Sequence, residues 1–337
     1  MQTALITHPT FLAHASPAWH PERPERLSAV MDGAIASGTV NTTLEAAPVE
    51  MELLSHVHSR RYIAAIEAFC ESGGGNLDAD TYAVAASWDA AIRAAGSGPQ
   101  AVGALLEGQA DVAFCAVRPP GHHAVAGRAM GFCLFNNVAV TAEYLIEAGF
   151  RVAVVDWDVH HGNGTQDLFV DRKEVLYISI HEYPFYPGSG WLDEVGYGPG
   201  LGTVLNLPLP SGTAGDVFRA AFGRVIQPVL AQYQPEWILV SAGYDAHALD
   251  PLADLRLEGP DYAFMASAIA DIVPAGRTIY FLEGGYHLDG IRSAVEATLR
   301  GAAGEVPDSE PVSKSPESAW RNLDLMSQAA KPFWKIG

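Results

Sequence analysis

The sequence predicts an α/β fold with a mainly parallel central sheet. Short apolar segments bounded by turn residues recur along the chain. They are apolar at consecutive positions rather than alternate ones, as in strands that are buried on both faces. Alanine- and leucine-rich segments of helical length lie between them. Such alternation of strands and helices indicates a parallel sheet with helices on both of its faces.

The expected elements follow from these two patterns. Seven apolar segments are expected strands: 4–6, 112–117, 152–155, 175–180, 204–207, 237–240 and 278–282. Five longer segments are expected helices: 83–95, 137–148, 217–232, 260–272 and 288–299. Residues 304–318 contain three prolines and four serines, which is typical of a linker, and the following tail is expected to dock through Leu323, Met326 and Phe333. We therefore expect one catalytic domain over residues 1–303, with a linker and a tail (304–337) that packs on it.

Composition excludes several classes of protein. Acidic residues number 39 and basic residues 20, so the net charge is −19 and the chain is expected to bind neither nucleic acid nor an anionic membrane surface. A cationic substrate would instead be attracted. Three cysteines (Cys70, Cys115 and Cys133) are too few for a disulfide framework and indicate a reducing compartment. We see no signal peptide and no apolar stretch of membrane-spanning length, and therefore expect a cytoplasmic protein.

Acidic and imidazole side chains follow two of the expected strands directly. Asp156, Asp158 and His160 come after 152–155, and Asp245 comes after 237–240. Asp158 and His160 point the same way in an extended segment, and with Asp245 they form an Asp/His/Asp set with an open fourth position. Such a set is typical of a catalytic zinc site, whereas structural zinc sites are closed and rich in sulfur. The competing interpretation is helix capping and solvent-facing polar groups.

Two further strands end in unusual residues. Segment 112–117 runs into a stiff Arg-Pro-Pro-Gly turn that presents His122 and His123, one of which would be a general base near neutral pH. Segment 278–282 runs into Glu-Gly-Gly-Tyr, where the two glycines permit a close approach of the backbone and Tyr286 would direct its hydroxyl at a developing oxyanion. A structural histidine pair and an ordinary turn are the alternatives. In parallel sheets ligands bind beyond the carboxyl ends of the strands, so these clusters are expected to meet.

Six motifs in this order resemble the zinc-dependent histone deacetylase family, which also includes acetylpolyamine amidohydrolases and other bacterial amide hydrolases. They are His20-Pro-Glu-Arg-Pro-Glu-Arg, Arg118-Pro-Pro-Gly-His-His-Ala, Gly131-Phe-Cys-Leu-Phe-Asn-Asn, Asp156-Trp-Asp-Val-His-His-Gly-Asn-Gly-Thr-Gln, Ser241-Ala-Gly-Tyr-Asp-Ala and Leu282-Glu-Gly-Gly-Tyr. The form with Asn163 resembles the class II branch. The resemblance implies an arginase/deacetylase-like three-layer α/β/α fold with a mainly parallel sheet of about eight strands.

The resemblance also implies roles for individual residues. Asp158, His160 and Asp245 would hold one Zn²⁺ per chain. His123 would be the general base and then acid, with His122 as its electrostatic partner and Asp156 behind it, and Tyr286 would polarise the scissile carbonyl. Substrate contacts would come from Gly131, Phe132, Tyr186, Leu252 and Asp80, for which Asp78 is a rival. A structural K⁺ would lie near Asp156, Asp158, His160, Ser179 and Ile180.

Three alternatives stay open beside an amide hydrolase acting on acetyl-lysine-type substrates. An arginase-like di-manganese enzyme would need further carboxylates where the chain has Gly162 and His247, and we expect His247 at the surface. A catalytically silent acetyl-ligand-binding protein would have lost one of the key side chains. An acetylpolyamine amidohydrolase or a broad small-amide amidase fits the acidic charge, but Leu252 stands where one polyamine branch carries Glu. We expect a homo-oligomer, a dimer or tetramer, as the resemblance implies.

Overall fold

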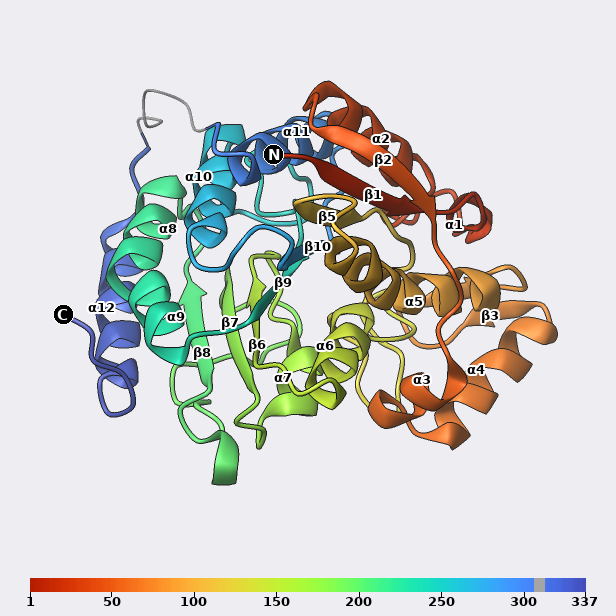
Figure 1. Cartoon of the computed structure of the whole chain (residues 1–337), viewed down its shortest axis with the longest axis horizontal. Coiled ribbons are helices and arrows are strands. Elements are labelled where there is room, and N and C mark those ends of the chain that lie inside the picture. Colours follow the sequence, from red (N-terminus) through yellow and green to blue (C-terminus); the bar gives the residue numbers. More distant parts are fainter. Residues whose placement is uncertain (306–312) are drawn as a thin grey trace.

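The computed structural model describes residues 1–305 and 313–337. Within these residues, eight parallel strands form one sheet in the order β2-β1-β5-β10-β9-β6-β7-β8, and helices cover both faces (Figure 1). The strands are β1 (Thr3–Thr7), β2 (Val40–Glu45), β5 (Val112–Cys115), β6 (Val152–Asp156), β7 (Val175–Glu182), β8 (Val204–Leu209), β9 (Trp237–Ala242) and β10 (Thr278–Leu282). A separate antiparallel pair joins β3 (Gly74–Asn76) to β4 (Tyr82–Val84). The predicted three-layer α/β/α arrangement is confirmed.

One strand of the large sheet was not predicted. All seven predicted strands are present, and the eighth is β2, with the sequence Val-Asn-Thr-Thr-Leu-Glu. It lies at the edge of the sheet, where every second residue is exposed. Its polar, alternating sequence therefore lacks the continuous apolar signal of the central strands.

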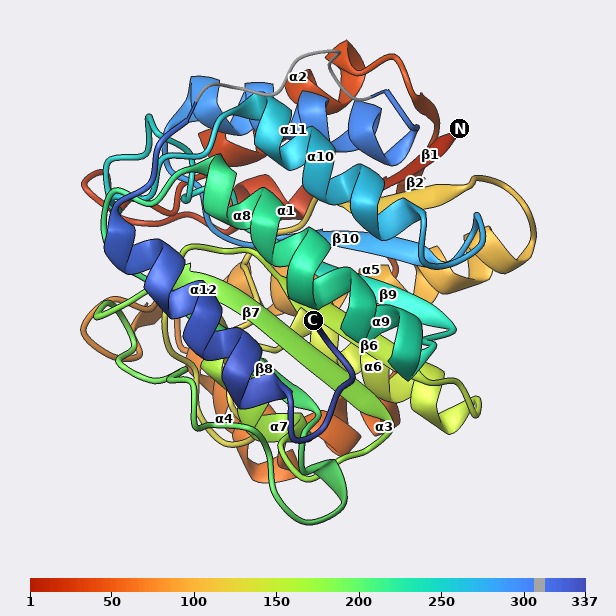
Figure 2. The ribbon, with the colours of Figure 1, turned by 90° about the vertical axis from the view of Figure 1, so that its left-hand side faces the viewer.

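The helices form one layer on each face of the sheet. On one face α5 (Ser87–Leu106) packs against α6 (Asn137–Glu147) and several strands, and α7 (Asn163–Phe169) lies near β7. On the other face α11 (Leu288–Ala302) packs between α2 (Glu25–Ala36) and α10 (Gly259–Ala270), as Figure 2 shows from the side. The remaining helices are α1 (Thr10–Ala13), α3 (Met51–Val57), α4 (Arg60–Glu71), α8 (Gly215–Ala221), α9 (Gln227–Tyr233), α12 (Glu317–Ala330) and a short 3₁₀ turn (Gly198–Gly200).

Two expected helices have different bounds. The helix expected over 83–95 begins later and continues through Pro99 to Leu106. The helix expected over 217–232 is interrupted by a π-helical turn, Phe222–Ile226, between α8 and α9. The helices before residue 83 were not predicted from the sequence. Within the described residues no helix combines the length and apolar character needed to cross a bilayer.

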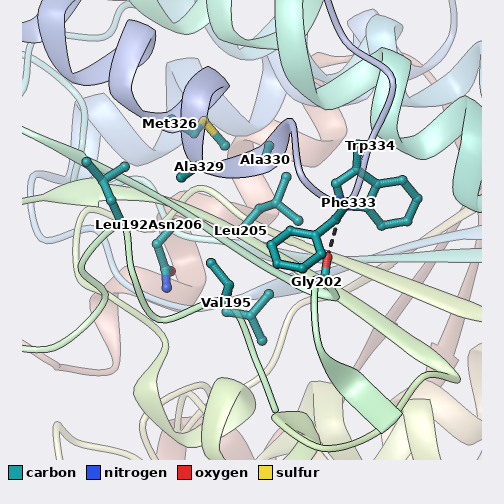
Figure 3. A pocket seen from close by; sticks show the side chains of 11 residues that line it. Leu192, Val195, Gly202, Leu205, Asn206, Met326, Ala329, Ala330, Phe333 and Trp334 are labelled. Atoms are coloured by element: carbon teal, nitrogen blue, oxygen red, sulfur yellow. Dashed lines mark hydrogen bonds between the residues drawn. The ribbon is translucent and has the colours of Figure 1, made fainter. Parts of the chain in front are cut away.

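The C-terminal tail packs on the edge of the sheet. Helix α12 lies against β8 and buries Leu323 and Met326, as predicted. Phe333 is half-exposed over Gly202, and the indole Nε1 of Trp334 donates a hydrogen bond to the carbonyl oxygen of Gly202 at 2.9 Å (Figure 3). The predicted linker lies partly outside the described residues.

The strand register aligns the ends of the four strands that precede the predicted site residues. Cys115, Phe281, Ser241 and Asp156 are paired across the four neighbouring strands β5, β10, β9 and β6. All four strands run in the same direction, so the segments that follow them leave the sheet at the same edge.

Candidate active site

The site lies beyond the carboxyl ends of four adjacent strands. Strand β6 supplies Asp156, Asp158 and His160, β9 supplies Asp245, and the segments after β5 and β10 supply the histidine pair and Tyr286. The structure thus brings together side chains that lie more than 160 positions apart in the sequence.

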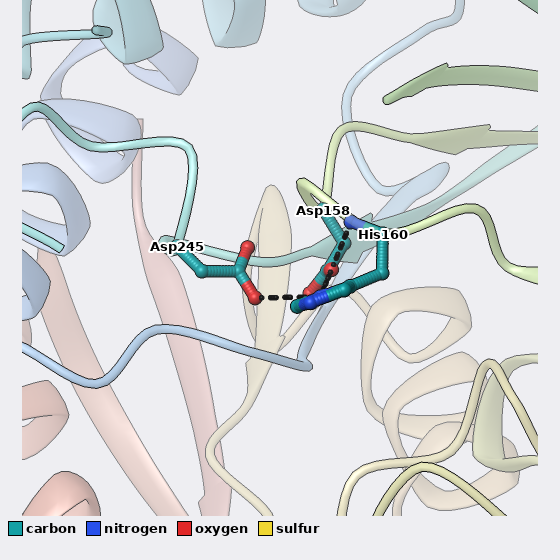
Figure 4. A group of neighbouring side chains, drawn as sticks. All are labelled: Asp158, His160 and Asp245. Atoms are coloured by element: carbon teal, nitrogen blue, oxygen red, sulfur yellow. Dashed lines mark hydrogen bonds and ion pairs between the residues drawn. The ribbon is translucent and has the colours of Figure 1, made fainter. Parts of the chain in front are cut away.

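Asp158, His160 and Asp245 surround one point (Figure 4). The Nδ1 atom of His160 lies 3.1 Å from Asp158 Oδ1 and 3.2 Å from Asp245 Oδ2. Backbone N–H groups fix both carboxylates: Gly284 donates to Asp158 Oδ2 at 2.7 Å, and Val159 donates to Asp245 Oδ1 at 2.9 Å. The remaining Asp245 oxygen, Oδ2, is buried and takes part in no hydrogen bond.

These three residues fit a divalent cation. They are the one group in the described part of the chain whose ligand atoms meet the spacing of a metal site. Two buried carboxylates beside a single imidazole leave an excess of negative charge, which a cation would compensate. The nitrogen and oxygen donor set matches zinc, and His160 also lines a cavity, so a fourth position faces open space.

Gly284 is required by close packing against these ligands. A Cβ atom at this position would run into the carboxylates of Asp245 and Asp158. The glycine therefore allows the backbone after β10 to donate its N–H to Asp158, as the sequence suggested for this pair of glycines.

His122 is the buried, charged member of the histidine pair. Its Nδ1–H donates to Asp156 Oδ2 at 3.0 Å, and its Nε2 lies 3.8 Å from Asp158 Oδ1. Burial alone would lower its pKa, but the carboxylates of Asp156, Asp158 and Glu283 outweigh burial and raise the pKa of His122 to about 10. Asp156 lies behind His122, as the resemblance implied.

His123 has a different partner and a different charge. Its Nδ1 is 2.8 Å from Asn163 Oδ1. We assign this as an Nδ1–H donor to the amide oxygen, a tautomer that leaves Nε2 unprotonated. Burial, reinforced by the positive charge of His122, holds the pKa of His123 well below its usual range. His123 is therefore neutral and suited to accept a proton.

Tyr286 lines the same cavity. It is 8% exposed, and its ring packs edge-to-face on Phe132 at a centroid distance of 5.9 Å. The guanidinium carbon of Arg26 lies 4.9 Å from the centre of the tyrosine ring. Burial raises the pKa of Tyr286 well above its usual value, so the hydroxyl stays protonated and can donate a hydrogen bond.

A cavity of about 230 Å³ connects these groups with the surface. Its lining includes the expected Gly131, Phe132, Tyr186, Leu252 and Asp80, together with both histidines, His160 and Tyr286. The ring of Tyr186 meets His123 edge-to-face at 5.1 Å. The cavity is small for a ligand site, which favours a slender substrate group.

Asp80, and not the alternative Asp78, lines the cavity. Asp78 Oδ1 instead accepts the backbone N–H groups of Asp80 and Thr81 at 3.1 and 2.6 Å. The Nε2 atom of His20 lies 2.9 Å from the carbonyl oxygen of Asp80. The His20 segment thus touches the rim.

The same N-terminal segment contains a buried ion pair. Glu22 accepts hydrogen bonds from Arg118 and from Arg26, and all three side chains are buried. The segment therefore combines a contact with the rim, through His20, and a buried arginine–glutamate ion pair.

Some outcomes differ from the sequence-based expectations. His247 is 7% exposed and stacks on Tyr262, so the expectation of a surface histidine was wrong. Sequence reasoning also missed Phe185, whose ring stacks on His160 at 5.2 Å, and the contact of Asn163 with His123. The asparagine had been noted only as part of a motif, and the motif does not reveal its partner.

The remaining expected residues lie beside the site. Ser179 on β7 is paired with Asp156 on β6, and its Oγ lies 2.9 Å from the Nδ1 atom of His181. The K⁺ expected near Ser179 and Ile180 stays a prediction. Cys133 is buried, and its thiol donates to the carbonyl oxygen of Gly131.

Comparison with known proteins identifies the family. Residues 20–302 match the profile described as the histone deacetylase domain. The chain belongs to the histone deacetylase family. Two similar proteins are a probable deacetylase of Archaeoglobus fulgidus and a histone deacetylase-like amidohydrolase of Pseudomonas aeruginosa. The first is 37% identical over 335 residues, covering 96% of this chain and 93% of the relative. The second is 37% identical over 312 residues, covering 86% and 81%.

The structure agrees with this assignment. The crystal structure of the HDA15 HD domain superimposes with a TM-score of 0.92 at 34% identity, covering 99% of this chain and 95% of the other. The histone deacetylase fold predicted from the motifs is therefore confirmed. As a member of this family, the chain is a hydrolase that acts on amide bonds.

Proposed function

We propose that this histone deacetylase family member is a zinc-dependent deacylase that cleaves the N-acetyl group of acetyl-lysine-type or related small amides. The observation that carries the proposal is a single buried cluster. A candidate metal-binding group, a neutral and a charged histidine and a protonated tyrosine lie together at one cavity, which His122, His123, His160 and Tyr286 line.

Asp158, His160 and Asp245 would hold the zinc ion. When bound, zinc would supply Lewis acidity toward the amide carbonyl and would make the attacking water more acidic. The open position toward the cavity is what a catalytic rather than a structural zinc requires. The same donor set would also accept other divalent ions, so the protein loaded with manganese or with iron is assayed beside the zinc-loaded protein.

The chain's own side chains would move the protons. His123 would accept the proton of the attacking water at Nε2 and later return it to the departing amine. His122, held as a cation by Asp156 and its other acidic neighbours, would stabilise the negative charge that develops near it. The Tyr286 hydroxyl would donate a hydrogen bond to the oxyanion, a contribution of about 10²–10³ in rate for comparable donors.

The cavity supports a slender acyl-aminoalkyl substrate. Phe132 and Tyr186 would flank the aliphatic chain, and Asp80 at the rim would accept hydrogen bonds from substrate N–H groups. Leu252 also lines the cavity, where a carboxylate would have favoured a distant ammonium group. The net charge of −19 nevertheless favours cationic substrates, so acetylpolyamines and simple amides form the second arm of the test.

The experiment measures hydrolysis by the zinc-loaded protein of acetyl-lysine and trifluoroacetyl-lysine peptides, acetylputrescine, acetylspermidine and an N-methyl amide. Tyr286→Phe and His123→Ala are measured beside it, with Tyr197→Phe at an exposed position as a matched control. We expect turnover of the lysine peptides that falls at least about 100-fold in both site variants and is unchanged in the control.

Each other outcome has a defined meaning. Preference for acetylpolyamines would replace the lysine-type substrate by that class. Tight binding of acetylated ligands without turnover would indicate a silent binding protein. Activity with manganese or iron but not with zinc would refute the proposed metal. A cytoplasmic location and a dimeric or tetrameric state stay predictions from the sequence.

A further inference from the structure

Asp250 is a buried carboxylate that the mechanism above does not use. It lies five residues after Asp245, is 8% exposed, and does not belong to the metal-binding group. Its Oδ2 atom accepts the backbone N–H of Tyr286 at 2.7 Å and that of His287 at 3.3 Å. Its Oδ1 atom accepts the backbone N–H of Leu252 at 3.0 Å.

The backbone around Tyr286 has little support of its own. Strand β10 ends at Leu282 and α11 begins at Leu288, so Tyr286 lies in an irregular connection. Gly285 adopts φ +115°, a backbone conformation that favours glycine. In the described part of the chain, no backbone carbonyl accepts the N–H of Tyr286 or of His287. Both donors rely on the carboxylate of Asp250.

The side chains of Arg26 and Asp250 both hold the backbone of this connection. Arg26 donates to the carbonyl oxygens of Glu283 and Gly285, and its guanidinium lies over the tyrosine ring. Asp250 accepts the N–H groups that follow. The backbone before and after the tyrosine is therefore fixed by side chains from distant parts of the sequence rather than by a helix or strand.

We propose that Asp250 is a positioning residue that fixes the Tyr286 hydroxyl over the reacting carbonyl. By accepting from Leu252 as well, it joins the tyrosine segment to a residue that lines the substrate cavity. This proposal rests on the proposed function, in which Tyr286 donates to the oxyanion. A misplacement of about 1 Å at such a donor can cost about 10²-fold in rate.

A carboxylate is needed at position 250 because each of its two oxygens accepts hydrogen bonds from a different segment of the backbone. An asparagine has one acceptor oxygen, so Asp250→Asn would keep the contact with Tyr286 and His287 or the contact with Leu252, but not both. Asp250→Ala removes all three. The two variants therefore form a graded series, and the asparagine variant preserves side-chain volume if the alanine variant folds poorly.

The test is a double-mutant cycle on kcat with the acetyl-lysine peptide. It uses the zinc-loaded protein, Asp250→Ala, Asp250→Asn, Tyr286→Phe and both double variants. Asp250→Ala should lower kcat about 10–100-fold with little change in KM, and Asp250→Asn should lower it less. In the Tyr286→Phe background either change should cost less than about threefold, because the hydroxyl that Asp250 positions is already absent. Equal losses in both backgrounds would overturn the proposal.

A second measurement does not depend on turnover. With 3-fluorotyrosine at position 286, the ¹⁹F line should be single and narrow in the unmodified protein and shifted or broadened in Asp250→Ala. Asp289→Ala, an exposed carboxylate three residues further along, is the matched control and should leave the line unchanged. An unaltered line in Asp250→Ala would refute positioning. Absence of turnover together with an altered line would refute the proposed function while supporting the structural role of Asp250.

Discussion

Acid should destabilise this protein through His58, a histidine buried in the protein interior. His58 is fully buried between the rings of Tyr62 and Phe135. Its Nδ1 lies 3.1 Å from the carbonyl oxygen of Val125, and its Nε2 accepts the backbone N–H of Asn136 at 2.9 Å. The histidine is thus neutral, with the proton on Nδ1, and protonating Nε2 would remove the acceptor that Asn136 uses.

The magnitude follows from the difference between the folded and unfolded pKa. Burial lowers the pKa of His58 from 6.5 to about 4. Because the folded pKa lies below the unfolded one, the unfolded chain binds the proton first. The stability contributed by neutral His58 is complete above pH 6.5 and is lost as the pH falls toward 4. At about pH 5 protonation favours the unfolded chain roughly 30-fold, which corresponds to about 2 kcal/mol.

The assay is urea unfolding near pH 7.5 and near pH 5 for the unmodified protein and for His58→Gln. Glutamine keeps one donor and one acceptor but does not titrate in this range. Burial also lowers the pKa of His14 and of His161 to about 4, so both proteins should lose stability in acid. The unmodified protein should lose about 2 kcal/mol more than His58→Gln. The exposed His56→Gln serves as control.

Equal losses of stability in the two proteins would refute the assignment of His58 as the acid-sensitive group. Equal losses would mean that the folded protein accommodates a charged His58. A smaller loss in the unmodified protein would mean that protonation stabilises the fold, which the contact with the Asn136 N–H forbids.

Three further predictions concern the metal site and the buried ion pair. Gly284→Ala places a methyl group against the carboxylates of Asp158 and Asp245, and should weaken zinc binding at least about 10-fold in a chelator competition; unchanged affinity would contradict the packing argument. Zinc removal by a chelator should abolish hydrolysis, and zinc should restore it; a fully active metal-free protein would exclude the proposed chemistry. Arg118→Met leaves the buried Glu22 with Arg26 alone and should lower the free energy of unfolding by roughly 3–5 kcal/mol in urea titrations. A loss below about 1 kcal/mol, the range of exposed ion pairs, would show that the Glu22 carboxylate does not need Arg118.

The local sequence determined which segments form the central sheet. All seven predicted strands are continuous apolar runs, and each central strand is buried on both faces. The polar residues directly after them could be assigned to one site because parallel strands end at a common edge. The edge strand Val40–Glu45 was missed because alternate exposure permits polar residues that carry no continuous apolar signal.

Tertiary structure decided which side chains become partners. Asn163 lies 40 residues from His123, His58 lies 78 residues from Asn136, and Asp250 lies 36 residues from Tyr286. His247 is buried because Tyr262 packs on it, although its own sequence neighbours favour a turn. Such pairings depend on how separate elements pack, and nothing in the spacing along the chain encodes them. The sequence therefore determined the candidate site residues and the edge of the sheet at which they meet, whereas packing determined the tautomer, the charge and the orientation of each.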